Sequence, residues 1–233
     1  MNKALVTGAN KGIGYGIAKE LIKRGWHVLV GARNKERGEA AVNKLNAIGK
    51  GKVEYLKVDL SNYTVIASTC EEIKDKHSDL KLLINNAGIP GDMSVLSYET
   101  QLKDIIETTQ VNFFGTFYLC QGLISILSKN NGKIINITVP TSTNPYWNPL
   151  AYKASKAAQN CMSEHFAFDF QKNNIPIEIY TVHPGPTTTD LNGNMSLPGF
   201  HKPDEVGKKI VDLLYDEQQH QGEFIEIYPI VAE

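Results

Sequence analysis

Two residues with the types and spacing for proton transfer, Tyr152 and Lys156, lie in the segment AYKASK. On a helix, side chains four residues apart share one face and are neighbours along the axis. An ammonium beside a phenol is expected to lower the phenol's pKa from its ordinary value of about 10. The Tyr152 hydroxyl would then give or take a proton closer to neutral pH. Many helices carry such a pair by chance, so its meaning depends on the rest of the chain.

A glycine-rich turn, TGANKGIG at residues 7–14, follows the first apolar run. The glycines at positions 8, 12 and 14 let the backbone curl tightly and approach a pyrophosphate at the start of the next helix. The spacing GxxxGxG matches the generic dinucleotide fingerprint only loosely. A glycine turn without a ligand is the alternative, but the strand–turn–helix context favours a nucleotide. Together with the tyrosine and lysine, this loop predicts a redox enzyme.

The end of the second apolar run bears on which dinucleotide binds. It reads GARN at residues 31–34 and has no acid, whereas an NAD-selective site usually carries Asp or Glu there. Arg33, together with Lys11 in the glycine loop, would offer two cations to a 2′-phosphate. The alternative is that both are solvated surface charges. The sequence favours NADP(H) over NAD(H).

Apolar runs of strand length alternate with helical patterns along the whole chain. Runs rich in Val, Ile and Leu predict strands buried on both faces, which is typical of a parallel sheet between helices. We therefore expect one α/β domain over residues 1–233, of doubly wound Rossmann type, with a seven-stranded parallel sheet and helices on both faces. The expected strands are 4–6, 27–30, 53–58, 80–84, 133–137, 177–182 and 223–228. The expected helices are 13–22, 35–48, 65–76, 100–127, 150–171 and 203–215.

Composition excludes several classes of protein. The chain has 233 residues, 42% of them hydrophobic, with a formal net charge of -1. A chain of this size can bury one large hydrophobic core. It lacks the excess of basic residues that binding to nucleic acid or an anionic membrane would need. We expect no metal, because the histidines show no paired spacing. Three separated cysteines, no leader-like start and no apolar run near the roughly 20 residues of a membrane span predict a cytoplasmic protein.

An ordered set of motifs resembles the short-chain dehydrogenase/reductase family over essentially the whole chain. The motifs are TGxxxGxG at 7–14, Asp59, NNAG at 85–88, Asn112, Tyr152-x-x-x-Lys156 and Pro184-Gly185. The segments TGANKGIG and GARN look most like the NADPH-dependent carbonyl reductase branch. In that branch, the lysine and arginine that match Lys11 and Arg33 hold the 2′-phosphate.

The resemblance implies a role for each matched position. Asp59 would accept from the adenine amino group, and Lys156 would hydrogen-bond the nicotinamide ribose as well as tune Tyr152. Asn112 would hold a water that links Lys156 to solvent. Taken singly, these residues could instead be a turn cap, a plain turn or a buried amide; the ordered set favours the functional reading. The implied cofactor contacts are completed by Gly8, Asn10, Lys11, Gly12, Ile13, Gly14, Arg33, Leu60, Asn86, Ala87, Gly88, Pro184, Gly185, Thr187 and Thr189.

One group that the family usually has is absent. Val139 stands thirteen residues before the tyrosine, where a serine usually hydrogen-bonds the substrate oxygen. Losing such a donor typically costs about 10²–10³ in rate. Our first interpretation is that Thr141 or Ser142 substitutes, since strand alternation would point Thr138 to the opposite face. The second is that Tyr152 alone protonates an activated carbonyl; the third is a dinucleotide-binding regulator with little turnover.

The substrate is expected to be a small carbonyl or alcohol compound, bound by residues before the tyrosine helix and by a lid. Thr141, Ser142, Tyr146 and Trp147 are the candidate contacts; the two aromatic residues would form a wall or be partly buried at the helix entrance. Residues 187–202 resemble a shortened, mobile lid. Monomeric carbonyl reductases of the family carry an insertion before the tyrosine that this chain lacks. We therefore expect a homodimer or homotetramer through the long helices.

Overall fold

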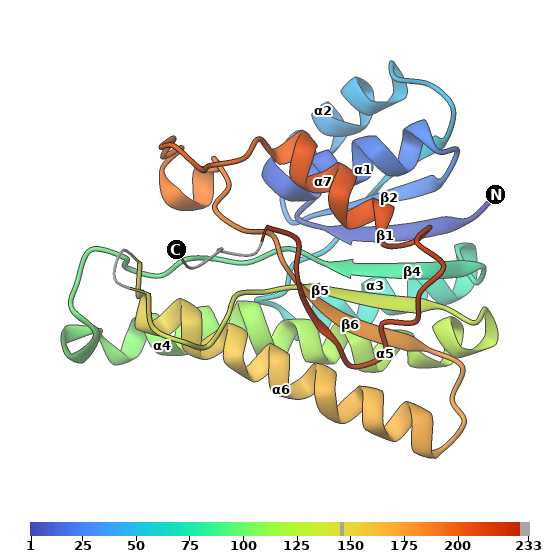
Figure 1. Cartoon of the computed structure of the whole chain (residues 1–233). Coiled ribbons are helices and arrows are strands. Elements are labelled where there is room, and N and C mark those ends of the chain that lie inside the picture. The colour runs from blue at the N-terminus through green and yellow to red at the C-terminus, as the bar shows by residue number, and fades with distance from the viewer. Residues whose placement is uncertain (145–146, 229–233) are drawn as a thin grey trace.

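The computed structural model describes residues 1–144 and 147–228 of the chain. Its centre is a seven-stranded sheet with the order β3-β2-β1-β4-β5-β6-β7, and every neighbouring pair of strands is parallel (Figure 1). This confirms the predicted fold class. The strands are β1 (Lys3–Thr7), β2 (His27–Ala32), β3 (Lys52–Lys57), β4 (Leu80–Asn85), β5 (Lys133–Ile137), β6 (Glu178–His183) and β7 (Phe224–Glu226).

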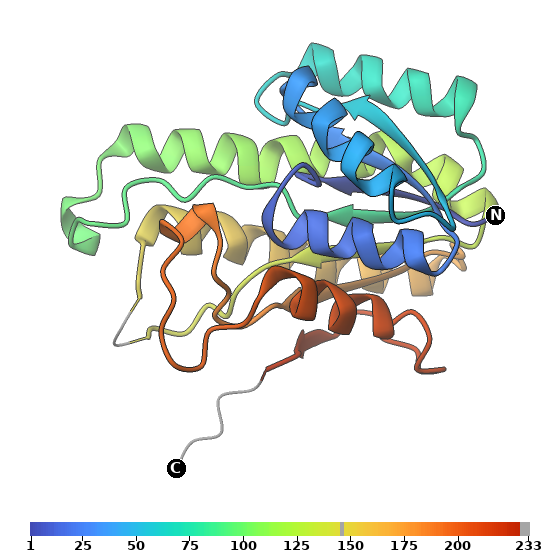
Figure 2. The ribbon, with the colours of Figure 1, turned by 90° about the horizontal axis from the view of Figure 1, so that it is seen from above.

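Helices cover both faces of the sheet. One core lies under α1, α2 and α7 and includes Ile17 and Ile210; the other lies under α3, α5 and α6 and includes Leu123 and Phe170. Figures 1 and 2 show this three-layer arrangement from the side and from above. The helices are α1 (Gly12–Lys23), α2 (Lys35–Asn46), α3 (Tyr63–Lys76), α4 (Leu102–Thr109), α5 (Thr116–Lys129), α6 (Leu150–Lys172) and α7 (Pro203–Asp212), with short 3-10 turns at Ser97–Glu99 and Asp190–Asn192.

The helix expected over 100–127 is interrupted in its middle. Between α4 and α5 the chain forms a π-helical segment, Gln110–Gly115. A Cβ at Gly115 would collide with the carbonyl of Leu60, so this segment presses closely on the chain after β3. Such bulges occur often at functional sites, and this one contains Asn112, which is fully buried.

Taken together, α4, the π-helical segment and α5 form a helical stretch, Leu102–Lys129, 28 residues, that is long and apolar enough by composition to cross a membrane, and it is the one such stretch in the described part of the chain. Its side chains Leu119, Leu123 and Leu127 are completely buried in the core against the sheet. Core helices pass the same test of length and composition, so this helix is weak evidence for a membrane span.

The strand order determines where a ligand is expected. The chain leaves β1 toward β2 on one side and reaches β4 on the other, so the order reverses between β1 and β4. In open α/β sheets, ligands bind outside the carboxyl ends of the strands at such a switch point. The glycine loop follows β1, and the segment Asn86–Gly88 follows β4. Both predicted elements therefore meet at this edge.

Candidate active site

The glycine loop is tied directly to the segment after β4. The Thr7 hydroxyl accepts from the backbone N–H groups of Asn86 and Ala87, both at 3.0 Å, and Asn86 Nδ2 donates to the Thr7 carbonyl at 2.9 Å. At Gly8 the chain takes a left-handed conformation, with φ +67, and its N–H donates to the Gly31 carbonyl at 2.8 Å. These bonds hold the loop rigidly at the switch point.

The residues of this loop fit a dinucleotide pyrophosphate. A Cβ at Gly14 would lie 2.6 Å from the Gly8 carbonyl oxygen, so no larger residue fits the curl. The N-terminus of α1 receives no side-chain cap, and its first turn contains no acid. Its free backbone N–H groups are therefore available to an anion, which the helix dipole also favours.

The two cations predicted for the 2′-phosphate are both exposed. Lys11 Nζ lies 2.8 Å from the Asp190 carboxylate, and both side chains are 56% exposed. This ion pair links the glycine loop to the predicted lid. Arg33 follows β2 directly, as expected.

Asp59, the predicted adenine contact, accepts from the backbone N–H of Ser61 at 3.1 Å and from its hydroxyl at 2.6 Å. It thus makes the turn-capping bonds that were the alternative reading of this residue. One oxygen takes both bonds, so the contact to adenine stays a prediction.

The candidate catalytic residues converge at the carboxyl ends of β4 and β5. Tyr152 and Lys156 lie on the buried side of α6, 8% and 1% exposed. The Lys156 amine is 5.8 Å from the centre of the Tyr152 ring. A Cβ at Gly88 would lie 3.1 Å from Asn112 Oδ1 and 3.8 Å from Lys156 Nζ. Asn112 and Lys156 therefore both lie beside Gly88 of the predicted NNAG segment, and Tyr152 lies next to Lys156.

Asn112 is held by both ends of its amide. Its Oδ1 accepts from the Ile89 N–H at 2.8 Å, and its Nδ2 donates to the Ile89 carbonyl at 3.0 Å and to the Ser155 hydroxyl at 2.9 Å. Ser155 in turn donates to the Tyr152 carbonyl at 2.7 Å. The π-helical segment and the tyrosine helix are thereby joined beside the reactive phenol.

The expected direction of the Tyr152 pKa shift is wrong for this structure. Burial raises the pKa of the phenol above its ordinary value, and burial lowers the pKa of Lys156 to about 7. Desolvation disfavours the charged form of each group. The sequence argument counted the attraction between the two charges and missed the cost of removing both from water.

Position 139 has no hydroxyl, and the three hydroxyls nearest to it in the sequence differ in their exposure. The Val139 carbonyl accepts from Asn160 Nδ2 at 3.1 Å. Thr141 and Ser142 are exposed. Thr138 is 1% exposed, and its hydroxyl has no hydrogen-bond partner among the described residues. Which hydroxyl serves the substrate oxygen stays a prediction.

Of the predicted aromatic wall, Trp147 stands against the candidate catalytic tyrosine. Its ring centre is 5.4 Å from that of Tyr152, in an edge-to-face arrangement. Tyr146 lies outside the described residues.

The predicted lid is anchored at its base. Thr187 pairs with His201 in an isolated bridge, and the Thr189 N–H donates to Asn192 Oδ1 at 3.1 Å. Asn192 Nδ2 reaches back to the Thr187 carbonyl at 2.9 Å. Pro184 and Gly185, the predicted carboxamide contacts, link this base to β6. Their cofactor contacts stay predictions.

The sequence reading missed a set of buried polar residues on α6. Gln159 is fully buried and accepts from the Lys156 amine at 2.8 Å; the amine also donates to the Ile137 carbonyl at 2.9 Å. Ser163, 1% exposed, continues the same side of the helix. The spacing of Tyr152, Lys156, Gln159 and Ser163 by four, three and four residues was the available signal.

Comparisons with known proteins agree with this geometry. The family model described as short chain dehydrogenase matches residues 2–198. A 3beta-hydroxysteroid dehydrogenase of Mediterraneibacter gnavus is 31% identical over 192 residues, which is 82% of this chain and 68% of the relative. Carbonyl reductase family member 4 of Xenopus laevis is 31% identical over 219 residues, 90% of this chain and 89% of the relative. The chain belongs to the short-chain dehydrogenase/reductase family.

Solved structures support the same fold. An alcohol dehydrogenase from the archaeon Thermococcus sibiricus, complexed with 5-hydroxy-NADP, superposes with a TM-score of 0.86 at 24% identity over 100% of both chains. An NADPH-bound carbonyl reductase from chicken fatty liver superposes with a TM-score of 0.82 at 22% identity, covering 97% of this chain and 96% of the other. Members of this family are oxidoreductases that use NAD(P)(H), and the chain is a dehydrogenase/reductase of that class.

Proposed function

We propose that this protein is an NADPH-dependent carbonyl reductase that transfers a hydride between NADP(H) and a small carbonyl or alcohol substrate. The observation that carries the proposal is that Asn112 and Lys156 lie beside Gly88, with the Tyr152 ring 5.8 Å from the lysine amine, at the edge of the sheet that also holds the glycine loop. The bound nicotinamide supplies or accepts the hydride at its C4 atom. This chain's own residues then have to manage the proton.

Tyr152 is the proton donor or acceptor in this proposal. Because burial raises the pKa of the phenol, it stays protonated at neutral pH, as a donor to the substrate oxygen must be during reduction. The Lys156 amine, 5.8 Å from the centre of the Tyr152 ring, would place positive charge near the phenol, and Asn112 is hydrogen-bonded to the segment beside both. Trp147 packs edge-to-face against the phenol ring.

The preference for NADP(H) rests on Lys11 and Arg33, two exposed cations near the switch point with no acid at the end of β2. NADP-type ligands are present in the two neighbouring structures described above, at less than 25% identity. Lys11 is paired with Asp190 in this structure, so a 2′-phosphate would have to replace that carboxylate.

The proposed substrate side is apolar. Met195 and Leu197 on the predicted lid are 51% and 57% exposed, and Trp147 faces Tyr152. Closure of the lid would bring these apolar side chains over a carbonyl compound held at Tyr152. We propose aldehydes, diketones and quinones as the first compounds to assay.

The decisive experiment titrates NADPH and NADH into the protein by fluorescence and then follows NADPH oxidation at about 340 nm with a carbonyl panel. We expect tighter binding of NADPH and turnover that falls by about 10²–10⁴-fold in Tyr152→Phe, which keeps the ring and removes the proton. The matched control is Tyr63→Phe, because Tyr63 is a half-exposed tyrosine on α3. Full activity in Tyr152→Phe would refute the assigned role.

A non-catalytic NADP(H)-binding regulator is the second candidate, and Val139 is the observation that favours it. Tight NADPH binding without turnover across the whole panel would support that function. Restoring the hydroxyl in Val139→Ser would then be expected to create measurable turnover, since the other groups are in place.

We also propose that the protein is a cytoplasmic homodimer or homotetramer that binds neither nucleic acid nor membrane. Free cysteines fit a reducing compartment. Exposed apolar side chains lie along the long helices, at Leu102, Ile106, Phe114 and Phe168. Light scattering coupled to size exclusion tests the assembly, and a monomer at micromolar concentration would refute it.

A further inference from the structure

We infer that Gln159 is a positioning residue for Lys156, and that its side-chain carbonyl keeps the lysine amine in place and in its charged form. The inference rests on the proposed function, because the charge of Lys156 matters to catalysis only if Tyr152 acts on a bound substrate. The starting observation is the hydrogen bond of 2.8 Å from Lys156 Nζ to Gln159 Oε1.

Both partners of this bond are removed from solvent. Gln159 is 0% and Lys156 1% exposed. Polar side chains are rarely buried so deeply unless a hydrogen bond compensates them. The helix α6 brings them together, because residues three apart lie on the same face. Water therefore contributes little to holding the amine, and the protein's own acceptors have to do so.

The groups that face Lys156 are neutral. From β5 the Ile137 carbonyl accepts at 2.9 Å, from the π-helical segment comes the neutral amide of Asn112, and from α6 itself comes the neutral phenol of Tyr152. Among the described residues no carboxylate lies in ion-pair contact with Lys156, although many other lysines have one. Because burial lowers the pKa of Lys156 to about 7, acceptor bonds decide how much of it is charged.

Of the two groups that accept hydrogen bonds from the Lys156 amine, one depends on the identity of a side chain. The Ile137 carbonyl belongs to the main chain and would be supplied by any residue at that position. The Gln159 carbonyl depends on the side chain. The Gln159 side chain is oriented with its oxygen toward the Lys156 amine. In this orientation its Nε2 donor has no partner among the described residues. The reverse orientation would put two donors against each other.

Gln159 is itself held by a buried polar chain. The Ser163 hydroxyl donates to the Gln159 main-chain carbonyl at 2.9 Å, and Asn136 Nδ2 donates to the Ser163 hydroxyl at 2.8 Å. Asn85 Nδ2 then donates to Asn136 Oδ1 at 2.8 Å. This chain runs from α6 through β5 to β4. It fixes the helix turn that carries Gln159 without touching the lysine.

The test compares two substitutions that act in opposite directions. Gln159→Met keeps the size and removes the acceptor, while Gln159→Glu replaces it with a carboxylate. We expect the titration midpoint of Lys156 to fall by about one pH unit in the first and to rise by about one unit or more in the second. The midpoint is measured on cofactor-free protein labelled with ¹³C at the lysine Cε, and the Lys156 signal is assigned by its loss in Lys156→Arg.

Ser163→Ala is the matched control, because it disturbs the same helix face but no contact of the lysine amine. Its midpoint is expected to equal that of the wild type. Shifts of both Gln159 variants in one direction, or no shift in either, would overturn the inference; if one variant does not fold, the other alone decides. A wild-type protein that turns over no carbonyl refutes the proposed function but leaves these midpoints measurable. In an active enzyme, the pH profile of kcat is expected to move with the midpoint.

Discussion

The two edges of the central sheet differ in how they treat buried polar groups. At the carboxyl edge, the hydrogen bonds of Lys156 among the described residues go to neutral acceptors, and Gln159 Nε2 and the Thr138 hydroxyl have no partner there. At the amino edge, charges are paired: Lys3 with Asp79, and Lys133 with Glu178. Unpaired buried polar groups destabilise a fold and are kept where they serve a ligand or a reaction.

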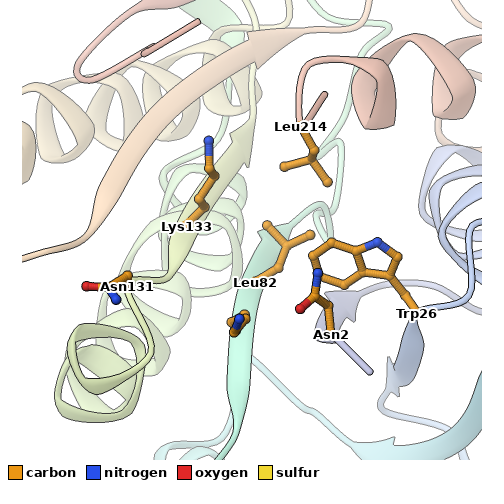
Figure 3. Close-up of a pocket in the computed structure, with 7 residues that line it drawn as sticks. Asn2, Trp26, Leu82, Asn131, Lys133 and Leu214 are labelled. Atoms are coloured by element: carbon orange, nitrogen blue, oxygen red, sulfur yellow. The ribbon is translucent and has the colours of Figure 1, made fainter. Parts of the chain in front are cut away.

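The amino edge nevertheless contains a hollow. A cavity of about 170 Å³ opens there, between the starts of several strands (Figure 3). Its lining is Asn2, Trp26, Lys81, Leu82, Asn131, Lys133 and Leu214. The Trp26 indole donates to the Tyr215 hydroxyl at 2.7 Å, which satisfies its one polar atom.

The contrast shows that hollow space alone does not identify a site. In the amino-edge cavity, Lys133 is paired with Glu178 and the Trp26 indole is satisfied, so these two groups are already used by the fold. The carboxyl edge combines a glycine loop, an uncapped helix N-terminus and a lysine with no counter-ion among the described residues. The difference between the edges therefore lies in the groups that could hold an anionic cofactor, and substitutions can test it.

The largest effect is expected from closing the glycine loop. Gly8 and Gly193 both have φ +67, but a Cβ at Gly8 would lie 3.0 Å from Ala87 Cα, whereas nothing lies within 4 Å of one at Gly193. Each change to alanine costs about 1 kcal/mol in backbone strain. Only in Gly8→Ala does the added methyl group also displace the glycine loop, because it meets Ala87. We therefore expect this variant to bind NADPH at least about tenfold more weakly.

Fluorescence titration of NADPH with Gly8→Ala and Gly193→Ala measures this difference. Thermal unfolding of both variants separates strain from loss of binding, because the strain is common to the two. Equal NADPH affinity in the two variants would mean that the loop at the carboxyl edge does not hold the cofactor.

The alternation of apolar runs with helical patterns predicted the fold, and individual strands show why. β1, β2 and β4 are buried on both faces, so their Val- and Leu-rich sequences could belong only to central parallel strands. The π-helical segment at Asn112 was not predictable, because it arises from the approach of Gly115 to the chain after β3, a tertiary contact.

The sequence indicated which residues form the candidate site but not how burial affects their charges. Motifs indicated Tyr152, Lys156 and Asn112, and the fold places Asn112 and Lys156 beside Gly88 and Tyr152 next to Lys156. Their spacing carried no information on burial, so the direction of the Tyr152 pKa shift was wrong. Gln159 was missed because no motif includes it, although its helical spacing from Lys156 was readable.

An intermediate effect is expected at the amino edge, in stability and not in activity. His220 Nδ1 lies 2.7 Å from Glu223 and its Nε2 lies 2.9 Å from Asp216. Burial lowers the pKa of His220, but bonding to Glu223 and Asp216 outweighs it, so that the pKa is raised. Because the pKa of His220 is raised in the folded state, its protonation stabilises the fold at pH values below the unfolded pKa of about 6.5. This stabilisation is lost as the pH rises through the folded-state pKa.

We therefore expect His220→Gln to lower the free energy of unfolding by about 1 kcal/mol at acidic pH and by less at alkaline pH. Urea unfolding at several pH values measures the trend. His27 is the matched contrast: its pKa is lowered, mainly by burial, so His27→Gln is expected to improve relative stability as the pH falls. The same pH trend in both variants would contradict the pairing at this edge. Turnover is expected to stay unchanged in His220→Gln.

The smallest effect is expected where the lid meets the glycine loop. Bonding to Lys11 lowers the pKa of Asp190, so this carboxylate is charged at neutral pH and competes with any 2′-phosphate for the amine. Both side chains are more than half exposed, and exposed ion pairs are weak because solvent screens them. In Asp190→Asn we expect NADPH to bind about two- to threefold more tightly at low salt, with NADH unchanged. High salt screens the effect. Weaker NADPH binding in this variant would place the 2′-phosphate away from Lys11, and the carboxyl edge would then have to select its cofactor by other residues.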